Sequence, residues 1–193
     1  QMCIRDRCSQ GLVRITQGSG TYVEDFAVDL VLGKRTRHQQ GLAQAGLRGS
    51  LVVLQAQTTR ATAALAKALQ VPARSPLLAL RVRGDAEGQP LHISERYFPL
   101  PRFENLAAVV RETGSITAGF TAHGVADYTR RESRITAELP SAEVAAQLRQ
   151  PTSRPVLQVE SLNVDLAGRP IEWARAWFAG DRVKLTIDHD EHA

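Results

Sequence analysis

The sequence is poor in cysteine and in long apolar runs, and each shortage excludes a class of protein. The only two cysteines among its 193 residues are Cys3 and Cys8, so the rest of the chain can form neither a disulfide framework nor a cysteine-ligated zinc site. No apolar run approaches the roughly 20 residues that span a bilayer. No apolar segment followed by a small-residue cleavage site marks a secretory signal. We therefore expect a cytoplasmic protein with no membrane partner.

Lysine is also scarce, and arginine supplies almost all of the positive charge. The net charge of +4 comes from 24 basic and 20 acidic residues, and 21 of the 24 are arginine. A charge this small does not identify a nucleic-acid binder. The arginine excess reflects either a compositional bias of the genome or planar groups that recognise phosphate or carboxylate in a bidentate manner.

Recognisable catalytic motifs are absent as well. The five histidines lack HExxH spacing, and the chain has neither a GxSxG elbow nor a GxxxxGK[ST] loop. The loop Gln17-Gly-Ser-Gly20 precedes a β-rich run, so it lacks the helix N-terminus on which a phosphate-binding loop depends. We expect no catalytic residue, no metal and no cofactor.

The patterns that are present predict an α+β fold with a mainly antiparallel sheet and flanking helices. Residues 12–16 and 21–23 flank a glycine-rich connection, which predicts a hairpin with a tight tip. Strands are expected at residues 51–57, 77–83, 91–98, 125–138, 156–164, 171–179 and 182–188. Helices are expected from Thr58 or Thr59 to Gln70, and at residues 106–112, 116–123 and 141–148. The chain then divides into an unrelated tail (1–10), the hairpin segment (11–24) and one domain (25–190).

Two arginines on one strand are candidates for an anion site. Arg81 and Arg83 point to one face of their expected strand, and the apolar residues that alternate with them point to the other. Like charges two residues apart repel, so an anion would stabilise them. Alternatively, Glu95 or Glu132 neutralises them as ordinary cross-strand pairs.

Two further residues have both a functional and an ordinary interpretation. Ser115 follows Gly114 at an expected helix start, where it either receives an anion or simply caps the helix. Glu172 precedes Trp173 in an expected strand, where it is either a ligand-facing acid or a residue on the solvent side of an edge strand.

Several motifs resemble one family of transcriptional regulators. Residues 11–23 (GLVRITQGSGTYV) resemble the end of a GntR-type winged helix-turn-helix domain, whose last hairpin is a glycine-rich wing. The rest of the chain resembles the UTRA effector-binding domain of the HutC subfamily, and in particular regulators of phosphonate metabolism. The UTRA domain shares its fold with chorismate lyase. The segments that carry this resemblance are RTR at 35–37, GSIT at 114–117, GVADYTRR at 124–131, LNVD at 162–165, GRP at 168–170 and FAGDRV at 178–183.

The resemblance implies a dimeric repressor that responds to a small phosphonate, phosphate or sugar phosphate. By position it assigns effector binding to Arg37, Arg81, Arg83, Ser115 and Glu172, with the strand arginines as a phosphate clamp. It assigns the DNA contacts of the wing to Arg14, Gln17, Gly18, Ser19 and Gly20. Because the helices that accompany such a wing do not appear before Gly11, we expect operator binding only from the intact protein.

Other functions stay open on the sequence alone. An enzyme similar to chorismate lyase would also use arginines and a buried acid, for which Arg81 and Glu172 are candidates, although an enzyme has no need of a wing. A regulator fragment that binds no effector is the other alternative. The chain also departs from the family pattern at residues 38–41, and Phe178 stands where sugar-phosphate-sensing relatives tend to have a tyrosine, so the identity of the effector is not fixed.

Overall fold

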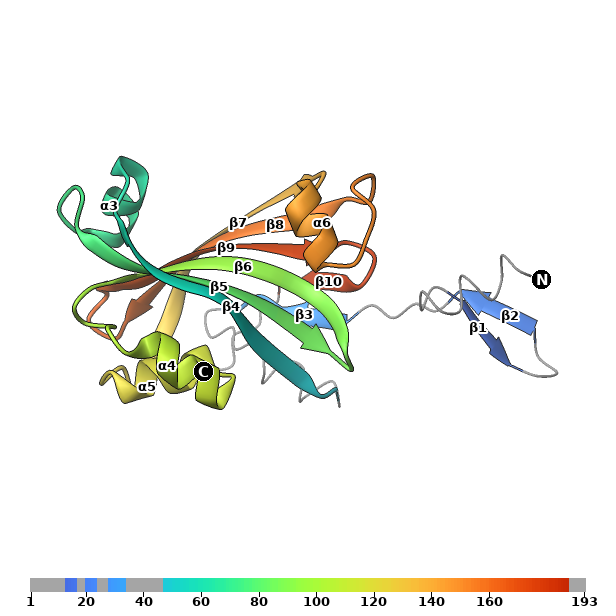
Figure 1. Ribbon diagram of the computed structural model, residues 1–193, viewed down its shortest axis with the longest axis horizontal. Coiled ribbons are helices and arrows are strands. Elements are labelled where there is room, and N and C mark those ends of the chain that lie inside the picture. Colours follow the sequence, from blue (N-terminus) through green and yellow to red (C-terminus); the bar gives the residue numbers. More distant parts are fainter. Residues whose placement is uncertain (1–12, 17–19, 24–27, 34–46, 188–193) are drawn as a thin grey trace.

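The described strands form one large sheet and two small ones in the computed structural model (Figure 1). The structure describes residues 13–16, 20–23, 28–33 and 47–187. The described elements, in chain order, are β1 (Val13–Thr16), β2 (Gly20–Val23), β3 (Val28–Val31), β4 (Gly49–Arg60), α3 (Ala63–Leu69), β5 (Pro76–Ala86), β6 (Gln89–Pro99), α4 (Leu106–Thr113), α5 (Ile116–Ala122), β7 (Tyr128–Glu138), α6 (Ala142–Gln147), β8 (Val156–Asp165), β9 (Pro170–Ala179) and β10 (Val183–Thr186).

The large sheet confirms the predicted fold class. Its six strands lie in the order β4-β5-β6-β9-β8-β7, and every neighbouring pair is antiparallel. Strands β5 and β6 form a hairpin, as do β8 and β9, as the turn-forming residues between them predict. Helices α4 and α5 lie on one side of this sheet, and α3 and α6 lie on the other (Figure 1). No helix in the described part of the chain is long and apolar enough to cross a bilayer.

The main hydrophobic core lies between the sheet and the pair α4–α5. Phe98, Phe103 and Phe120 are fully buried there, with their rings 5.7–5.9 Å apart in edge-to-face arrangements. Tyr128 packs on Phe120 at 4.8 Å. The apolar residues of β5 that alternate with the arginines complete this core, as their spacing predicts: Leu78, Leu80 and Val82.

One strand and its pairing were not predicted from the sequence. Strands β3 and β10 pair in parallel in a separate two-stranded sheet, with Val28 opposite Val183. The buried side chains of β3, Val28 and Leu30, pack with Val159 and Ala176 of the large sheet. Period-two patterning shows that a strand is half-buried but does not give the direction of its partner.

The start of the first predicted helix is also wrong. Strand β4 continues through both expected caps, Thr58 and Thr59, because its backbone stays paired with β5 as far as Arg60. The helix cap is Thr62, whose hydroxyl oxygen accepts a hydrogen bond from the backbone N–H of Leu65 at 3.3 Å.

The predicted N-terminal hairpin is present. Strands β1 and β2 pair antiparallel, with Arg14 opposite Tyr22 and Thr16 opposite Gly20. The three residues of its tip, Gln17, Gly18 and Ser19, lie outside the described residues.

Two glycines provide a matched test of how tightly the sheet is packed. Gly84 of β5 lies opposite His92, and a methyl group at residue 84 would overlap the buried His92 ring. We expect Gly84→Ala to lower the free energy of unfolding by about 1–3 kcal/mol because the ring has no room to move. The methyl group added by Gly33→Ala would meet no atom within 4 Å, so this variant should change the free energy of unfolding by less than about 0.5 kcal/mol. Urea unfolding of both variants measures the difference, and equal stabilities would contradict it.

Candidate functional site: a buried ionic cluster

Four polar side chains from four neighbouring strands meet on the face of the sheet that α4 and α5 cover. They are Arg96 of β6, Glu172 of β9, Asn163 of β8 and Arg130 of β7. Glu172 lies at the centre and is 1% exposed. One carboxylate oxygen accepts a hydrogen bond from Arg96 Nη1 at 2.6 Å, and the other accepts one from Asn163 Nδ2 at 2.5 Å.

Strand register and a β-bulge bring these residues together. Asn163 pairs with Glu172 on one side and with Arg130 on the other, and Arg130 Nε donates to Asn163 Oδ1 at 3.4 Å. The register of β7 shifts between Arg130 and Glu132, so the intervening residue is extra. A bulge re-aims the side chains on either side of it. Arg130 therefore shares the covered face with Asn163, while Glu132 pairs with Leu162 and faces the opposite way.

The cluster holds more positive than negative charge in a buried place. Its two guanidinium groups, Arg96 and Arg130, face a single carboxylate, Glu172. Burial lowers the pKa of Arg130 from its ordinary value, with Glu172 opposing this effect and the nearby charge of Arg96 adding to it. Because a buried charge is costly unless it is paired, an anion placed beside Arg130 would relieve this surplus.

Hydrogen bonds link the cluster to the neighbouring elements. Arg96 Nε donates to Ser94 Oγ at 3.1 Å, and Ser94 is fully buried. Tyr128, two residues before Arg130, forms a hydrogen bond through its hydroxyl group with Thr117 Oγ1 of α5 at 3.0 Å. Ser115 caps α5, and its Oγ accepts from the backbone N–H of Ala118 at 3.2 Å. Capping, one of the two interpretations of Ser115, is thus observed, and its role in effector binding stays a prediction.

The structure does not bring the two arginines of the predicted phosphate clamp together with Ser115 and Glu172, and their role in effector binding stays a prediction. Arg81 and Arg83 lie on the sheet face opposite to Ser115 and Glu172, because strand side chains alternate and their neighbours face α4 and α5. Arg81 forms an ion pair with Glu143 of α6. Arg83 binds Asp85 through two hydrogen bonds of 2.8 and 2.9 Å. Both arginines are therefore paired with acids, as the alternative held, but these acids are Glu143 and Asp85 and not the predicted Glu95 or Glu132.

Arg81 is also the first member of a row of alternating charges. In register across five strands lie Arg81, Glu95, Arg175, Glu160 and Arg134. The Arg175 guanidinium and the Glu160 carboxylate are 2.8 Å apart.

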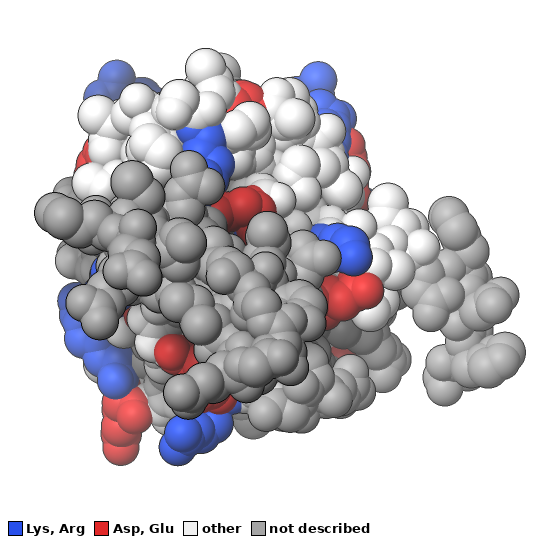
Figure 2. All heavy atoms as spheres, turned by 90° about the vertical axis from the view of Figure 1, so that its right-hand side faces the viewer, with Lys and Arg blue, Asp and Glu red and all other residues white. Residues whose placement is uncertain are grey.

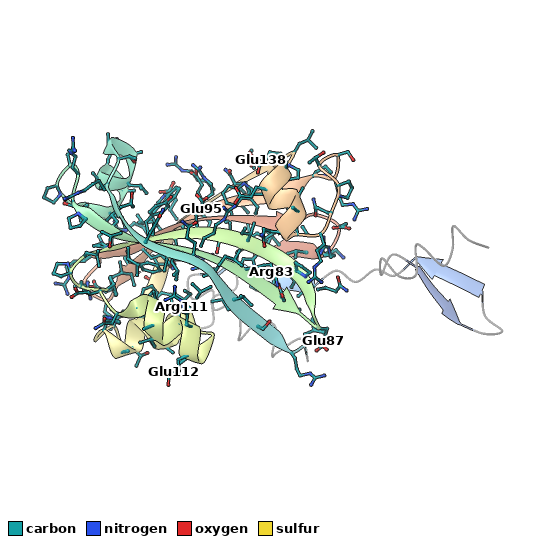
Figure 3. All side chains as sticks on the ribbon, in the orientation of Figure 1. Arg83, Glu87, Glu95, Arg111, Glu112 and Glu138 are labelled. Carbon is teal, nitrogen blue, oxygen red and sulfur yellow. The ribbon has the colours of Figure 1, made fainter. Side chains whose placement is uncertain are left out.

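Charged residues also lie on other parts of the surface. Figure 3 labels Arg83 and Glu95 on the sheet, and Arg111 and Glu112 on α4. Figure 2 shows basic and acidic residues close together at the end of the molecule that it presents.

The structure gives no side-chain positions for the other residues predicted to bind effector or DNA. Arg37, Gln17, Gly18 and Ser19 lie outside the described residues. Arg14 and Gly20 are placed by backbone in the β1–β2 hairpin. The roles assigned to these residues stay predictions.

Glu172 is the predicted residue that the structure places at the centre of the buried ionic cluster. The alternative of a solvent-facing residue on an edge strand is wrong, since β9 is an interior strand and Glu172 is buried. Sequence reasoning missed Arg96, Arg130 and Asn163. Arg96 lies two residues before the core residue Phe98, and this spacing could have placed its side chain on the core face of the strand. The sequence contains no corresponding signal for the bulge after Arg130.

The fold is that of an α+β domain with a buried ionic cluster on the helix-covered face of its sheet. Residues 44–184 match the UTRA domain, and the chain belongs to the UTRA-domain family. It is 37% identical over 180 residues to the uncharacterized HTH-type transcriptional regulator RB1450 of Rhizobium meliloti (strain 1021), covering 93% of this chain and 74% of that protein. It is 23% identical to MngR of Escherichia coli (strain K12), the mannosyl-D-glycerate transport/metabolism system repressor, covering 97% of this chain and 78% of MngR.

Solved structures share the fold. PhnF from Mycobacterium smegmatis superposes with a TM-score of 0.81 at 23% identity, over 98% of this chain and 84% of PhnF. The C-terminal domain of the histidine utilization repressor from Pseudomonas syringae pv. tomato gives a TM-score of 0.62 at 17% identity, over 75% of this chain and all of that domain. The fold likeness agrees with the UTRA match and with the 37% identical regulator, which make the chain the effector-binding part of a GntR-family transcriptional regulator and not an enzyme and so confirm the family predicted from the sequence.

Beside the cluster, Asp165 fixes the turn between β8 and β9. Its carboxylate accepts hydrogen bonds from Arg102 Nη1 at 3.0 Å and from the backbone N–H groups of Ala167 at 3.1 Å and Arg169 at 3.0 Å. Burial raises the pKa of Asp165, but these hydrogen bonds and the two positive charges outweigh burial and lower it below its ordinary value.

This lowered pKa predicts a loss of stability in acid. A carboxyl group whose pKa is lower in the folded state stabilises the fold above its unfolded pKa, and that contribution disappears as the pH falls below about 4. We expect Asp165→Asn to be less stable than wild type at neutral pH and to lose less stability between about pH 4 and pH 2. Urea unfolding across this range measures the effect, and parallel curves for the two proteins would contradict it.

Proposed function

We propose that this chain senses a small phosphonate or phosphate, which binds beside Arg96 and Arg130 in the buried cluster and changes the affinity of a repressor for its operator. The observation that carries the proposal is the pairing of two guanidinium groups with one carboxylate, Glu172. The segments that resemble regulators of phosphonate metabolism, such as RTR at 35–37 and GVADYTRR at 124–131, support a phosphonate as the effector and phosphonate metabolism as the regulated process.

The geometry suggests a distinct task for each member of the cluster. Glu172 holds Arg96 and Asn163 in place through its two short hydrogen bonds. Among the described residues, the Arg130 side chain donates one weak hydrogen bond, to Asn163, so most of its N–H groups are available to an oxyanion. Ser94, which accepts a hydrogen bond from Arg96, adds a hydroxyl group to the same cluster. A tetrahedral anion with two or three oxygens fits this set of donors.

Binding at the cluster has a short route to the DNA-binding side of the chain. Ser94 pairs with Ala176, on which β3 packs, and β3 follows the β1–β2 hairpin in the chain. A ligand that favours one position of β3 would change operator affinity, and by linkage DNA would change effector affinity by the same factor. In this proposal the wing residues Arg14, Gln17, Gly18, Ser19 and Gly20 contact DNA in the intact cytoplasmic protein.

Thermal unfolding with methylphosphonate separates the buried cluster from the clamp predicted by sequence. At about 100 times its dissociation constant, the ligand should stabilise the wild type by about 2.7 kcal/mol. In a domain of this size, that raises Tm by about 5–10 °C. Arg130→Gln should abolish the increase, because the main anion ligand is lost while Glu172 keeps Arg96.

Arg81→Gln is the matched control, since it removes the same charge from the opposite face, where its partner Glu143 is exposed. It should retain the increase. Loss of the increase in Arg81→Gln alone would support the sequence-predicted clamp instead. An unchanged Tm in the wild type with methylphosphonate, phosphate and glucosamine 6-phosphate alike would reject the proposal.

We also propose that the chain is a homodimer, as paired operator half-sites require. Light scattering on a size-exclusion column should give twice the mass of one chain. A mass equal to one chain at micromolar concentration would contradict the dimer without bearing on the effector site.

A further inference from the structure

An open groove lies on the other face of the sheet, directly behind the buried cluster. It has a volume of about 700 Å³ and runs between α3 and strands β6, β9, β8 and β7. This volume falls within the range of about 300–1,000 Å³ that is usual for small-molecule sites. None of the residues that carry the proposed effector site, Arg96, Arg130, Asn163 and Glu172, lines it.

The floor of the groove is aromatic and apolar. Tyr97, Leu162 and Trp173 are each half-buried there, and Leu65 of α3 forms the facing wall. The Tyr97 and Trp173 rings lie 5.9 Å apart at 47°, so they form a bent surface rather than a closed stack. Flat apolar groups gain stabilisation from such a surface through stacking and through loss of apolar contact with water.

The rim of the groove offers two cations that are not engaged with carboxylates in the described structure. Lys67 of α3 is exposed and forms no ion pair with any described residue, and Arg131 donates to the carbonyl oxygen of Gly168. Two acids of the groove are already paired, Glu132 with Arg134 and Glu160 with Arg175.

The third acid, Glu95, lies beside the Tyr97 hydroxyl group. Burial raises the pKa of Tyr97, and the charge and hydrogen bond of Glu95 raise it further. Glu95 would repel an anion on its own side of the floor, so the favourable place for negative charge is the Lys67–Arg131 rim.

The same strand segments build the groove and the cluster. Consecutive residues point to opposite faces: Glu172 and Trp173 on β9, Arg96 and Tyr97 on β6, Asn163 and Leu162 on β8. On β7, the side chains on either side of the start of the bulge also point to opposite faces, since Arg130 belongs to the cluster and Arg131 lines the groove. A ligand in the groove would therefore contact the strands that hold the cluster.

We propose that this groove is a second binding site, for a planar aromatic molecule that carries one anionic group. The ring lies on Tyr97 and Trp173, and the anionic group lies between Lys67 and Arg131. This site is independent of the proposed effector site, since it uses other side chains and the opposite face of the sheet.

Trp173 itself reports on the groove. The chain has two tryptophans, and Trp177→Phe leaves Trp173 as the only one. In this background, benzoate should change the Trp173 fluorescence in a saturable manner. Benzyl alcohol, which has the ring without the charge, and methylphosphonate, which has the charge without the ring, should bind in the groove at least about tenfold more weakly.

The rim is tested with charge-removing variants in the same background. Lys67→Gln combined with Arg131→Gln should weaken benzoate binding about tenfold or more. Arg111→Gln, which removes an exposed charge from α4 on the other side of the sheet, should leave it unchanged.

Three outcomes would overturn the proposal. One is the absence of a saturable response to benzoate at millimolar concentrations. Another is an equal loss of affinity in the Arg111→Gln variant. The third is a response that tracks a change in the mass of the assembly by light scattering, which would make the groove an interface between copies of the chain. The Tm increase with methylphosphonate is measured separately, so failure of the groove leaves the effector site standing, and the reverse also holds.

Discussion

The buried carboxylate of Glu172 is the group on which the organisation of this domain depends. It is 1% exposed in the middle of an interior strand, a place where an unpaired charge would be prohibitively costly. Arg96 and Asn163 satisfy its two oxygens, and both must come from strands that flank β9. This requirement fixes the register of β6, β9 and β8 relative to one another. It also leaves Arg130, on the next strand, as a second cation that forms no ion pair with a carboxylate of the described residues.

The six-stranded sheet separates two kinds of electrostatic environment. On the exposed face, Arg81, Glu95, Arg175, Glu160 and Arg134 alternate in sign, so every charge has an opposite neighbour. On the covered face, the described cluster holds two guanidinium groups and one carboxylate. An anion arriving from solution gains little on the exposed face, where ions are already paired and screened. It gains more on the covered face, where the dielectric constant is lower and a positive charge is unmatched.

Particular residues show what could be read from the sequence. The alternation of Leu78, Leu80 and Val82 with Arg81 and Arg83 correctly predicted two opposite faces, but not which of them the helices would cover. Ser115 was correctly predicted as a helix cap, because the hydroxyl group and the following apolar residues are a local signal. Glu172 had two interpretations, as a ligand-facing acid or as a solvent-facing residue of an edge strand, and only the position of β9 in the strand order decided against the second. Arg130 could not be found, because a β-bulge leaves no mark in a strand of alternating polar residues.

The sequence by itself determined the family, the fold class and most elements, because period-two runs, turn residues and caps are local patterns that act over a few residues. The tertiary structure alone decided which charges meet. Arg96, Asn163, Glu172 and Arg130 come from separate strands, and their meeting depends on the order β6-β9-β8-β7 and on one bulge. Strand order and register are set by the packing of the whole sheet, and no short segment of the chain records them.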